Sequence, residues 1–166
     1  MTARSANFLG FLACAGLLAY AYYAQFFLHL EPCPLCIFQR VGVFAIAIVF
    51  VLAGAHDPAG WGRRVYAALI ALMGLATVGV AARQLYIQSL PPGSVPACGA
   101  SLDFMLKVFP LTDVLEKVLT GSGECAKIDW RFLGLAMPAW VLIAALGLSA
   151  WGLWANLRRR PPVLRF

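Results

Sequence analysis

Four long apolar runs constrain this chain more than any other feature of its sequence. They cover roughly residues 8–28, 37–55, 65–82 and 133–154, and Arg40 is the only charged residue within them. An α-helix rises about 1.5 Å per residue, so each run reaches or approaches the length needed to span a hydrocarbon core about 30 Å thick. Because lipid satisfies no backbone polar group, each run is predicted to be a transmembrane α-helix.

The composition supports a fold surrounded by lipid. Of the 166 residues, 62% are hydrophobic and 12% are charged, whereas soluble domains are about half apolar and about a quarter charged. Charge this scarce could hardly cover a water-facing surface. We therefore predict an all-α membrane protein in which residues 1–166 form a single membrane domain, a bundle of four transmembrane helices. Pro138 is expected to kink the fourth helix locally.

The basic residues are distributed unequally between the two ends of these helices. One side comprises the N-terminus, the loop 56–64 and the C-terminal tail. Its basic residues are Arg4, Arg63, Arg64, Arg158, Arg159, Arg160 and Arg165. On the other side, the short turn 29–36 has no lysine or arginine, and the basic residues of the long segment are offset by acidic ones. The positive-inside rule then predicts that both termini are cytoplasmic. It also accounts for the net charge of +6 without nucleic-acid binding.

A long polar segment, about residues 83–131, connects the third and fourth helices. A connector of this length in a compact protein is usually functional. Its middle carries apolar residues at helical spacing: Leu111, Val114, Leu115, Val118 and Leu119. This spacing predicts a short helix lying in the bilayer interface. Pro91, Pro92, Gly93 and Pro96 are expected to hold Cys98 in an extended, accessible stretch, and Cys125 follows in a second stretch that is expected to be mobile.

The cysteines divide into one helix residue and a group on the predicted outer side. Cys14 lies within the first apolar run and is interpreted as a core residue, because a free cysteine behaves as a small hydrophobe. The outer group consists of Cys33, Cys36, Cys98 and Cys125. An even number of cysteines in an oxidising compartment indicates disulfides. Four cysteines permit three pairings, and the residues alone do not choose among them.

The motif "EPCPLCIFQR", residues 31–40, places Cys33 and Cys36 at the mouth of the second helix. Cys36 lies where the helix begins, and the unsatisfied N–H groups there favour a thiolate. Arg40 follows at i+4 on the same face and adds a fixed positive charge. We interpret Cys36 as a thiol placed to ionise and to face an electron-poor group at the lipid boundary. The alternative for Arg40 is that it only extends toward lipid headgroups.

Two structural interpretations of these cysteines are weaker. Metal sites favour two close pairs, whereas Cys98 and Cys125 are far apart in sequence, so no metal site is predicted. A disulfide between Cys33 and Cys36 closes so short a loop that it would remove little chain entropy. A redox function is therefore the better hypothesis.

The motifs "EPCPLCIFQR", "VPACG", "GSGECA" and "DWRFLGLAMPAW", together with four membrane helices, resemble those of the disulfide bond formation protein B (DsbB) family. The resemblance implies a disulfide-generating thiol:quinone oxidoreductase, a multi-pass protein of the bacterial inner membrane whose redox cysteines face the periplasm. It also implies a membrane quinone, either ubiquinone or menaquinone, as the electron acceptor. The implied partner is a periplasmic thioredoxin-like protein of the DsbA type, which this relay reoxidises.

The same resemblance assigns roles to individual residues. Cys98 and Cys125 would form the loop disulfide that meets the partner, and Cys98 would form the mixed disulfide. Electrons would then pass by thiol–disulfide exchange to Cys33 and Cys36. Cys36 would face the quinone ring, and Arg40 would polarise a quinone oxygen.

One position departs from the family pattern. Many members carry a histidine near the outer end of the third helix, and Ser89 stands in the matching region here. Gln84 and Arg83 are candidates to act in its place, although interface anchoring is the simpler interpretation of both. Two other functions stay open at this point: a related oxidoreductase with fewer partners, and a non-enzymatic membrane scaffold with two structural disulfides.

Overall fold

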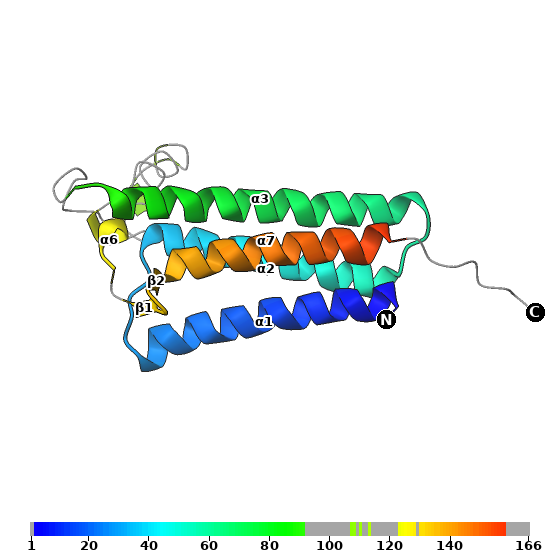
Figure 1. Ribbon diagram of the computed structural model, residues 1–166, viewed down its shortest axis with the longest axis horizontal. Coiled ribbons are helices and arrows are strands. Elements are labelled where there is room, and N and C mark those ends of the chain that lie inside the picture. The colour runs from blue at the N-terminus through cyan, green and yellow to red at the C-terminus, as the bar shows by residue number, and fades with distance from the viewer. Residues whose placement is uncertain are drawn as a thin grey trace, which may run out of the picture.

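The computed structural model describes residues 2–91, 107–108, 110, 113, 123–128 and 130–158. Four long helices dominate it: α1 (Ala3–Phe27), α2 (Pro34–His56), α3 (Trp61–Ser89) and α7 (Met137–Leu157). All four are long and apolar enough to cross a membrane. They lie side by side in one elongated bundle (Figure 1). The predicted all-α, four-helix membrane fold is therefore confirmed.

Short elements gather at one end of the bundle. They are helix α6 (Gly123–Ala126) and strands β1 (Arg131–Phe132) and β2 (Leu135–Ala136). The start of α2 lies at the same end, which we call the cysteine end, whereas the start of α1 and the end of α7 lie at the opposite, terminal end (Figure 1). The apolar residues of the predicted interfacial helix, and Cys98, lie outside the described residues.

The outside of the bundle is apolar, as a lipid-facing surface must be. Only 22% to 33% of each membrane-spanning window is buried inside the protein. Large hydrophobic side chains such as Leu12, Phe44 and Leu75 are more than half exposed. In water such a surface would drive aggregation, so its natural solvent is the hydrocarbon of a bilayer.

Small residues let the helices approach closely inside the bundle. A side chain on Gly42 of α2 would collide with Thr77 of α3, and one on Gly74 of α3 would collide with Ser149 of α7. Close backbone approach at small residues is the main packing device of membrane helices, because lipid provides no hydrophobic driving force between them. Cys14 is fully buried in the central core cluster, which confirms its interpretation as a core residue.

Two asparagines join α1 to α7 at the terminal end. Asn7 Nδ2 donates to Asn156 Oδ1 at 3.1 Å, and Asn156 Nδ2 donates to Asn7 Oδ1 at 3.0 Å. Arg63 of α3 reinforces the junction by donating from Nε to the carbonyl oxygen of Asn156 at 2.8 Å. The polar groups of these side chains are thereby satisfied without water.

The start of the fourth helix differs from the prediction. The apolar run begins near residue 133, but β1 and β2 pair there in a tight antiparallel hairpin, with Phe132 opposite Leu135. Leu133 and Gly134 form its turn at φ values of 50° and 81°, outside the helical region. Helix α7 begins only at Met137, and Pro138 lies in its first turn. A proline there removes no helical hydrogen bond, so it starts the helix, and the predicted kink is wrong.

Helix α3 is longer than the apolar run that predicted it. It continues past residue 82 to Ser89 because its buried face continues, with Ala81, Gln84 and Ile87 at intervals of three residues. This extension carries α3 to the level of the cysteines at the start of α2.

Candidate redox site

Two cysteines meet at the first turn of α2. Cys33 is the N-cap residue, and its Sγ accepts a hydrogen bond from the Cys36 backbone N–H at 3.4 Å. Pro34 follows within the first turn, where its fixed φ favours helix initiation. The Cys33 thiol donates to Cys36 Sγ, with the sulfurs 3.1 Å apart. The motif therefore lies at the helix mouth, as its spacing predicted.

Helix α6 brings a third sulfur to the pair. The expectation of a mobile stretch at Cys125 is wrong, because the residue lies in α6 and is buried. It packs with Cys33, Leu35 and Ile87 in one small cluster. Contact with Cys125 is the largest cause that raises the pKa of the Cys33 thiol, followed by the contact with Cys36 and by burial. Cys33 therefore remains a protonated hydrogen-bond donor between its two neighbours. The structure brings together Cys33, Cys36 and Cys125, whereas Cys98 lies outside the described residues.

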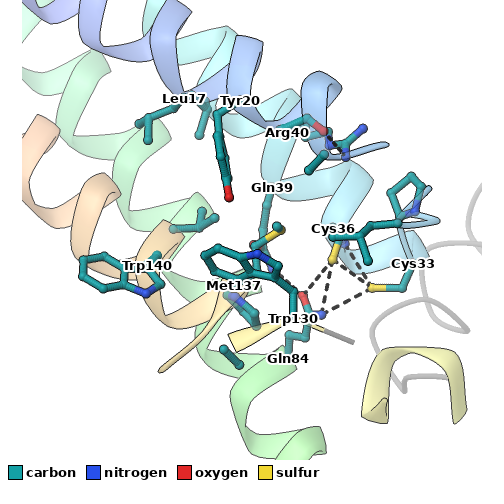
Figure 2. Close-up of a pocket in the computed structure, with 18 of the residues that line it drawn as sticks. Leu17, Tyr20, Cys33, Cys36, Gln39, Arg40, Gln84, Trp130, Met137 and Trp140 are labelled. Carbon is teal, nitrogen blue, oxygen red and sulfur yellow. Dashed lines mark hydrogen bonds between the residues drawn. The ribbon is translucent and has the colours of Figure 1, made fainter. Parts of the chain in front are cut away.

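A buried amide from α3 faces the cysteine pair. Gln84 is 3% exposed, and its Nε2 lies 3.3 Å from Cys33 Sγ and 3.3 Å from Cys36 Sγ. Its Oε1 accepts hydrogen bonds from Gln39 Nε2 at 2.6 Å and from the Cys36 thiol at 3.6 Å. Figure 2 shows the Gln84 amide pointing at both sulfurs, with Gln39 behind it.

Of the three residues weighed near the outer end of the third helix, Gln84 is the one that reaches the site. Ser89 is exposed, and its hydroxyl donates to the carbonyl oxygen of Tyr86 at 2.7 Å. Arg83 lies over the Tyr86 ring at 5.3 Å. Gln39 was missed by the sequence analysis. The available signal was an amide in an otherwise apolar run, one helical turn after Cys36.

Arg40 lies at the edge of the site, and its hydrogen bonds run to α1. The guanidinium donates from Nη2 to the carbonyl oxygen of Ala21 at 3.1 Å and from Nη1 to Gln25 Oε1. It also lies 5.3 Å from the centre of the Tyr22 ring. The residue shares a face of α2 with Cys36, as the i+4 spacing predicted, and it helps to line the cavity described next.

A cavity of about 170 Å³ opens beside Cys36. Its polar end is formed by Cys36, Gln39, Arg40 and Gln84. The rest of its wall is mostly apolar or aromatic and includes Leu17, Tyr20, Trp130, Met137, Trp140 and Val141. Figure 2 shows Leu17 and Tyr20 of α1, Met137 and Trp140 of α7, and Trp130 around this space. The Cys36 sulfur thus borders an apolar space inside the bundle.

The β-hairpin holds an aromatic side chain against this cavity. Trp130 stacks on Phe132, with ring centres 6.0 Å apart, and meets the edge of Tyr20 at 6.1 Å. Trp140 Nε1 donates to the Phe132 carbonyl oxygen at 3.2 Å, which ties the hairpin to α7. The apolar run that begins near residue 133 did not predict this arrangement, because it includes the residues of the hairpin turn, Leu133 and Gly134.

Comparison with known proteins identifies the family. The model of the family described as "Disulfide bond formation protein DsbB" matches residues 3–155. "Disulfide bond formation protein B" of Methylococcus capsulatus is 51% identical over 160 residues, covering 95% of this chain and 98% of that protein. The proteins of the same name from Nitrosococcus oceani and Chromobacterium violaceum are 51% and 48% identical. They cover 93% and 96% of this chain and 91% and 96% of their own lengths. This chain therefore belongs to the DsbB family of disulfide bond formation proteins.

Proposed function

We propose that this protein is an inner-membrane thiol:quinone oxidoreductase. It takes electrons from a periplasmic dithiol protein of the DsbA type, passes them to a membrane quinone, and thereby supports disulfide bond formation. One observation carries the proposal: Cys125, Cys33 and Cys36 form a contiguous row of sulfurs that ends at an apolar cavity inside a membrane-spanning bundle.

The first half of the reaction is thiol–disulfide exchange. A partner thiolate attacks Cys98 of a Cys98–Cys125 disulfide, and Cys125 leaves as a thiolate. Cys125 then attacks the Sγ of Cys33, against which it packs. The Cys33–Cys36 bond breaks, and Cys36 keeps its electron pair. Each exchange breaks one S–S bond and forms another, so relative redox potentials set its direction.

The two cysteines of the helix mouth have different tasks. Cys33 is in contact with Cys125 and is therefore the electrophilic sulfur of the pair. Cys36 lies within the first turn of α2 and borders the cavity. The positive end of the helix dipole favours the thiolate on Cys36. The geometry thus supports Cys36 as the residue that faces the electron acceptor.

The cavity fits a quinone headgroup. Its aromatic and aliphatic walls suit a flat apolar ring, while Arg40 and Cys36 suit the polar carbonyl edge. When bound, the quinone supplies an acceptor for two electrons and two protons. A shallow apolar groove between α1 and α7 shares Leu17, Tyr20 and Ala144 with the cavity wall. That groove gives an apolar tail a path toward the lipid.

The location follows from charge. The basic residues at the terminal end favour a cytoplasmic position for both termini, which puts the cysteine end on the periplasmic side. This arrangement gives the loop cysteines access to a soluble partner, while Cys36 stays at the level of a lipid-soluble acceptor.

An anaerobic assay tests the proposal. Purified protein is mixed with a reduced DsbA-type partner and a soluble quinone, and quinone absorbance is followed. We expect quinone to be consumed in proportion to partner dithiol. Cys36→Ser should abolish quinone reduction, although the partner can still be trapped on Cys98. Cys14→Ala, in the core cluster away from the cavity, should keep full turnover per folded molecule. Normal quinone reduction by Cys36→Ser would overturn the electron path.

Thiol alkylation separates the relay from a structural scaffold. The protein is alkylated with and without reduced partner, and the modified cysteines are identified by mass spectrometry. A relay opens its disulfides when the partner is present. If Cys98 and Cys125 were protected equally in both samples, the scaffold would be the correct interpretation.

A further inference from the structure

We propose that Gln84 is a catalytic residue of this relay, whose side-chain N–H groups stabilise the thiolate left on Cys36 when the Cys33–Cys36 disulfide opens. We further propose that Gln39 is a positioning residue that holds the Gln84 amide in this orientation. The inference rests on the proposed function and deepens it, because it assigns to α3 a part in the sulfur chemistry of α2.

The position of the Gln84 amide supports this role. Its Nε2 is equidistant from the two sulfurs, at 3.3 Å from each. A primary amide carries two N–H donors, so one can serve each sulfur. In the reduced pair the donor is therefore within reach of both sulfurs.

The strength of these hydrogen bonds depends on the state of the sulfur. A neutral thiol or disulfide sulfur is a weak acceptor, whereas a thiolate accepts charge-assisted hydrogen bonds. The Gln84 donors are therefore poorly satisfied before the disulfide opens and well satisfied afterwards. An interaction that strengthens as charge develops lowers the barrier of the step that creates the charge.

Gln39 explains why the amide presents its nitrogen to the sulfurs. The Gln39 Nε2 donates to Gln84 Oε1 at 2.6 Å, and both side chains are 3% exposed. While Cys36 is a thiol, Gln84 Oε1 also accepts a hydrogen bond from its Sγ at 3.6 Å, so this oxygen is close enough to meet the sulfur. Without the bond to Gln39, the amide could turn and place this oxygen against the thiolate, which would oppose ionisation. Gln39 thus acts through Gln84 rather than on the sulfurs.

The other polar groups near Cys36 are engaged elsewhere or exposed, so Gln84 is the best-placed donor to a Cys36 thiolate. Arg40 of α2 directs its hydrogen bonds to α1. Cys33 donates one thiol hydrogen bond. Glu31 and Lys127, which also line the cavity, are exposed to solvent. Among the described side chains of α3, Gln84 is the one that hydrogen-bonds to Cys36 Sγ.

The step can be written with its electrons balanced. The Cys125 thiolate attacks Cys33 Sγ, and a Cys125–Cys33 bond forms. The Cys33–Cys36 bond breaks, and its electron pair remains on Cys36 Sγ. No proton moves in this step, so one negative charge passes from Cys125 to Cys36. The Gln84 amide, whose Nε2 lies 3.3 Å from Cys36 Sγ, stabilises the charge that arrives on this sulfur.

Two measurements on purified full-length protein test the role of Gln84. The first is kcat with reduced partner and a soluble quinone, together with KM for the partner. The second is the rate at which iodoacetamide alkylates Cys36 of the reduced protein at neutral pH, followed by peptide mass spectrometry. Because iodoacetamide reacts with the thiolate, this rate reports its population without any quinone.

Gln84→Leu keeps the approximate size and removes the donors. We expect kcat and the Cys36 alkylation rate to fall by about tenfold to a hundredfold, somewhat less than the loss of an oxyanion-hole donor to an alkoxide-like charge. KM for the partner should not change. Gln84→Glu, which places a carboxylate beside the thiolate, should lower both quantities further. The matched control is Thr77→Val, a buried polar group on the same helix whose hydroxyl donates to the Met73 carbonyl oxygen at 2.8 Å. It should leave both quantities unchanged.

Further variants keep the test decisive. If Gln84→Leu does not fold, Gln84→Asn retains the polar amide but withdraws it by one methylene, and it should show the same two losses. Gln39→Leu should show smaller losses, and the double variant with Gln84→Leu should lose no more than Gln84→Leu alone.

Two outcomes overturn the inference. An unchanged alkylation rate in Gln84→Leu would show that the amide does not stabilise the thiolate, whatever happens to kcat. Additive losses in the double variant would show that Gln39 does not act through Gln84. Failure of the wild-type protein to reduce quinone would instead contradict the proposed function, and the alkylation comparison would still decide the role of Gln84.

Discussion

Two buried amide pairs join helices at opposite ends of the bundle, and they use their hydrogen bonds differently. At the terminal end, Asn7 and Asn156 exchange two reciprocal hydrogen bonds at 3.1 and 3.0 Å. At the cysteine end, Gln39 and Gln84 share a single hydrogen bond at 2.6 Å. Gln84 accepts that bond through Oε1, and its Nε2 donors point at Cys33 and Cys36.

The orientation of the amide donors distinguishes a pair that only joins two helices from a pair that can also take part in a reaction. Asn7 and Asn156 direct their amides at each other, and Asn156 Nδ2 also donates to the Gly152 carbonyl oxygen, so their contribution is to helix association. A pair that directs donors at weakly accepting sulfurs gives up some of that stability. Polar groups inside a membrane bundle are costly, and those without full partners mark functional sites more often than fasteners.

The largest expected effect on stability comes from breaking the reciprocal pair. Asn156→Leu leaves the Asn7 amide buried without its partner, which should cost about 1–3 kcal/mol of unfolding free energy. Because the pair lies far from the cysteines, kcat per folded molecule should not change. Gln84→Leu should show the opposite pattern, with a large loss of kcat and a smaller loss of stability. Reversible unfolding in mixed detergent micelles measures the stability, and the quinone assay measures kcat.

If Asn156→Leu and Gln84→Leu each lost both stability and activity, the two amide pairs would not have the separate roles assigned to them. The double variant Asn7→Leu/Asn156→Leu is the control for the terminal end. It removes both amides, leaves no unsatisfied group, and should recover part of the lost stability.

A pH series sharpens the comparison, because the asparagine pair carries no titratable group and the sulfur cluster does. Cys33 has its pKa raised by Cys125 and Cys36 and by burial. Above about pH 8.5, the ordinary thiol pKa, Cys33 loses its proton in the unfolded chain but keeps it in the fold. The reduced protein should therefore lose up to about 1.4 kcal/mol of stability per pH unit above that point from this group.

The control is Cys33→Ser, in which this part of the slope should disappear. The measurement is the unfolding free energy of the reduced protein across the alkaline range. If the unfolding free energy of Cys33→Ser fell with pH as steeply as that of the unchanged protein, Cys33 would not be the buried, protonated thiol described above.

Arg40 is a further polar residue at the cysteine end, and it combines features of both amide pairs. Its hydrogen bonds to Ala21 and Gln25 resemble a fastener, whereas its place in the cavity wall resembles a binding group. For Arg40→Ala we expect the apparent KM for quinone to rise by about fivefold, because the polar end of the cavity loses its fixed positive charge. Steady-state kinetics over a range of soluble quinone concentrations measure it. An unchanged KM together with lower stability would assign Arg40 to anchoring alone.

The parts of the site that sequence analysis predicted are those set by local spacing. Cys33 and Cys36 are three residues apart with Pro34 between them, so any helix starting there must hold both sulfurs at its first turn. Arg40 follows Cys36 by one turn and must share its face. The one local signal for Gln39 is an amide in an apolar run about one turn after Cys36, and that signal alone does not show that the amide contacts Gln84 of another helix.

The amino-acid sequence by itself determined the four membrane helices, the helix-mouth cysteine pair and the family, because hydrophobic length and short motifs act within a single segment. Tertiary structure alone decided which side chains meet the sulfurs. Gln84 reaches them because Gly42 of α2 lets Thr77 of α3 approach closely, which brings the cysteine-end turns of the two helices together. Cys125 reaches Cys33 because α6 packs against α3. Such contacts depend on how helices distant in sequence pack, and no periodicity within one helix specifies its neighbour.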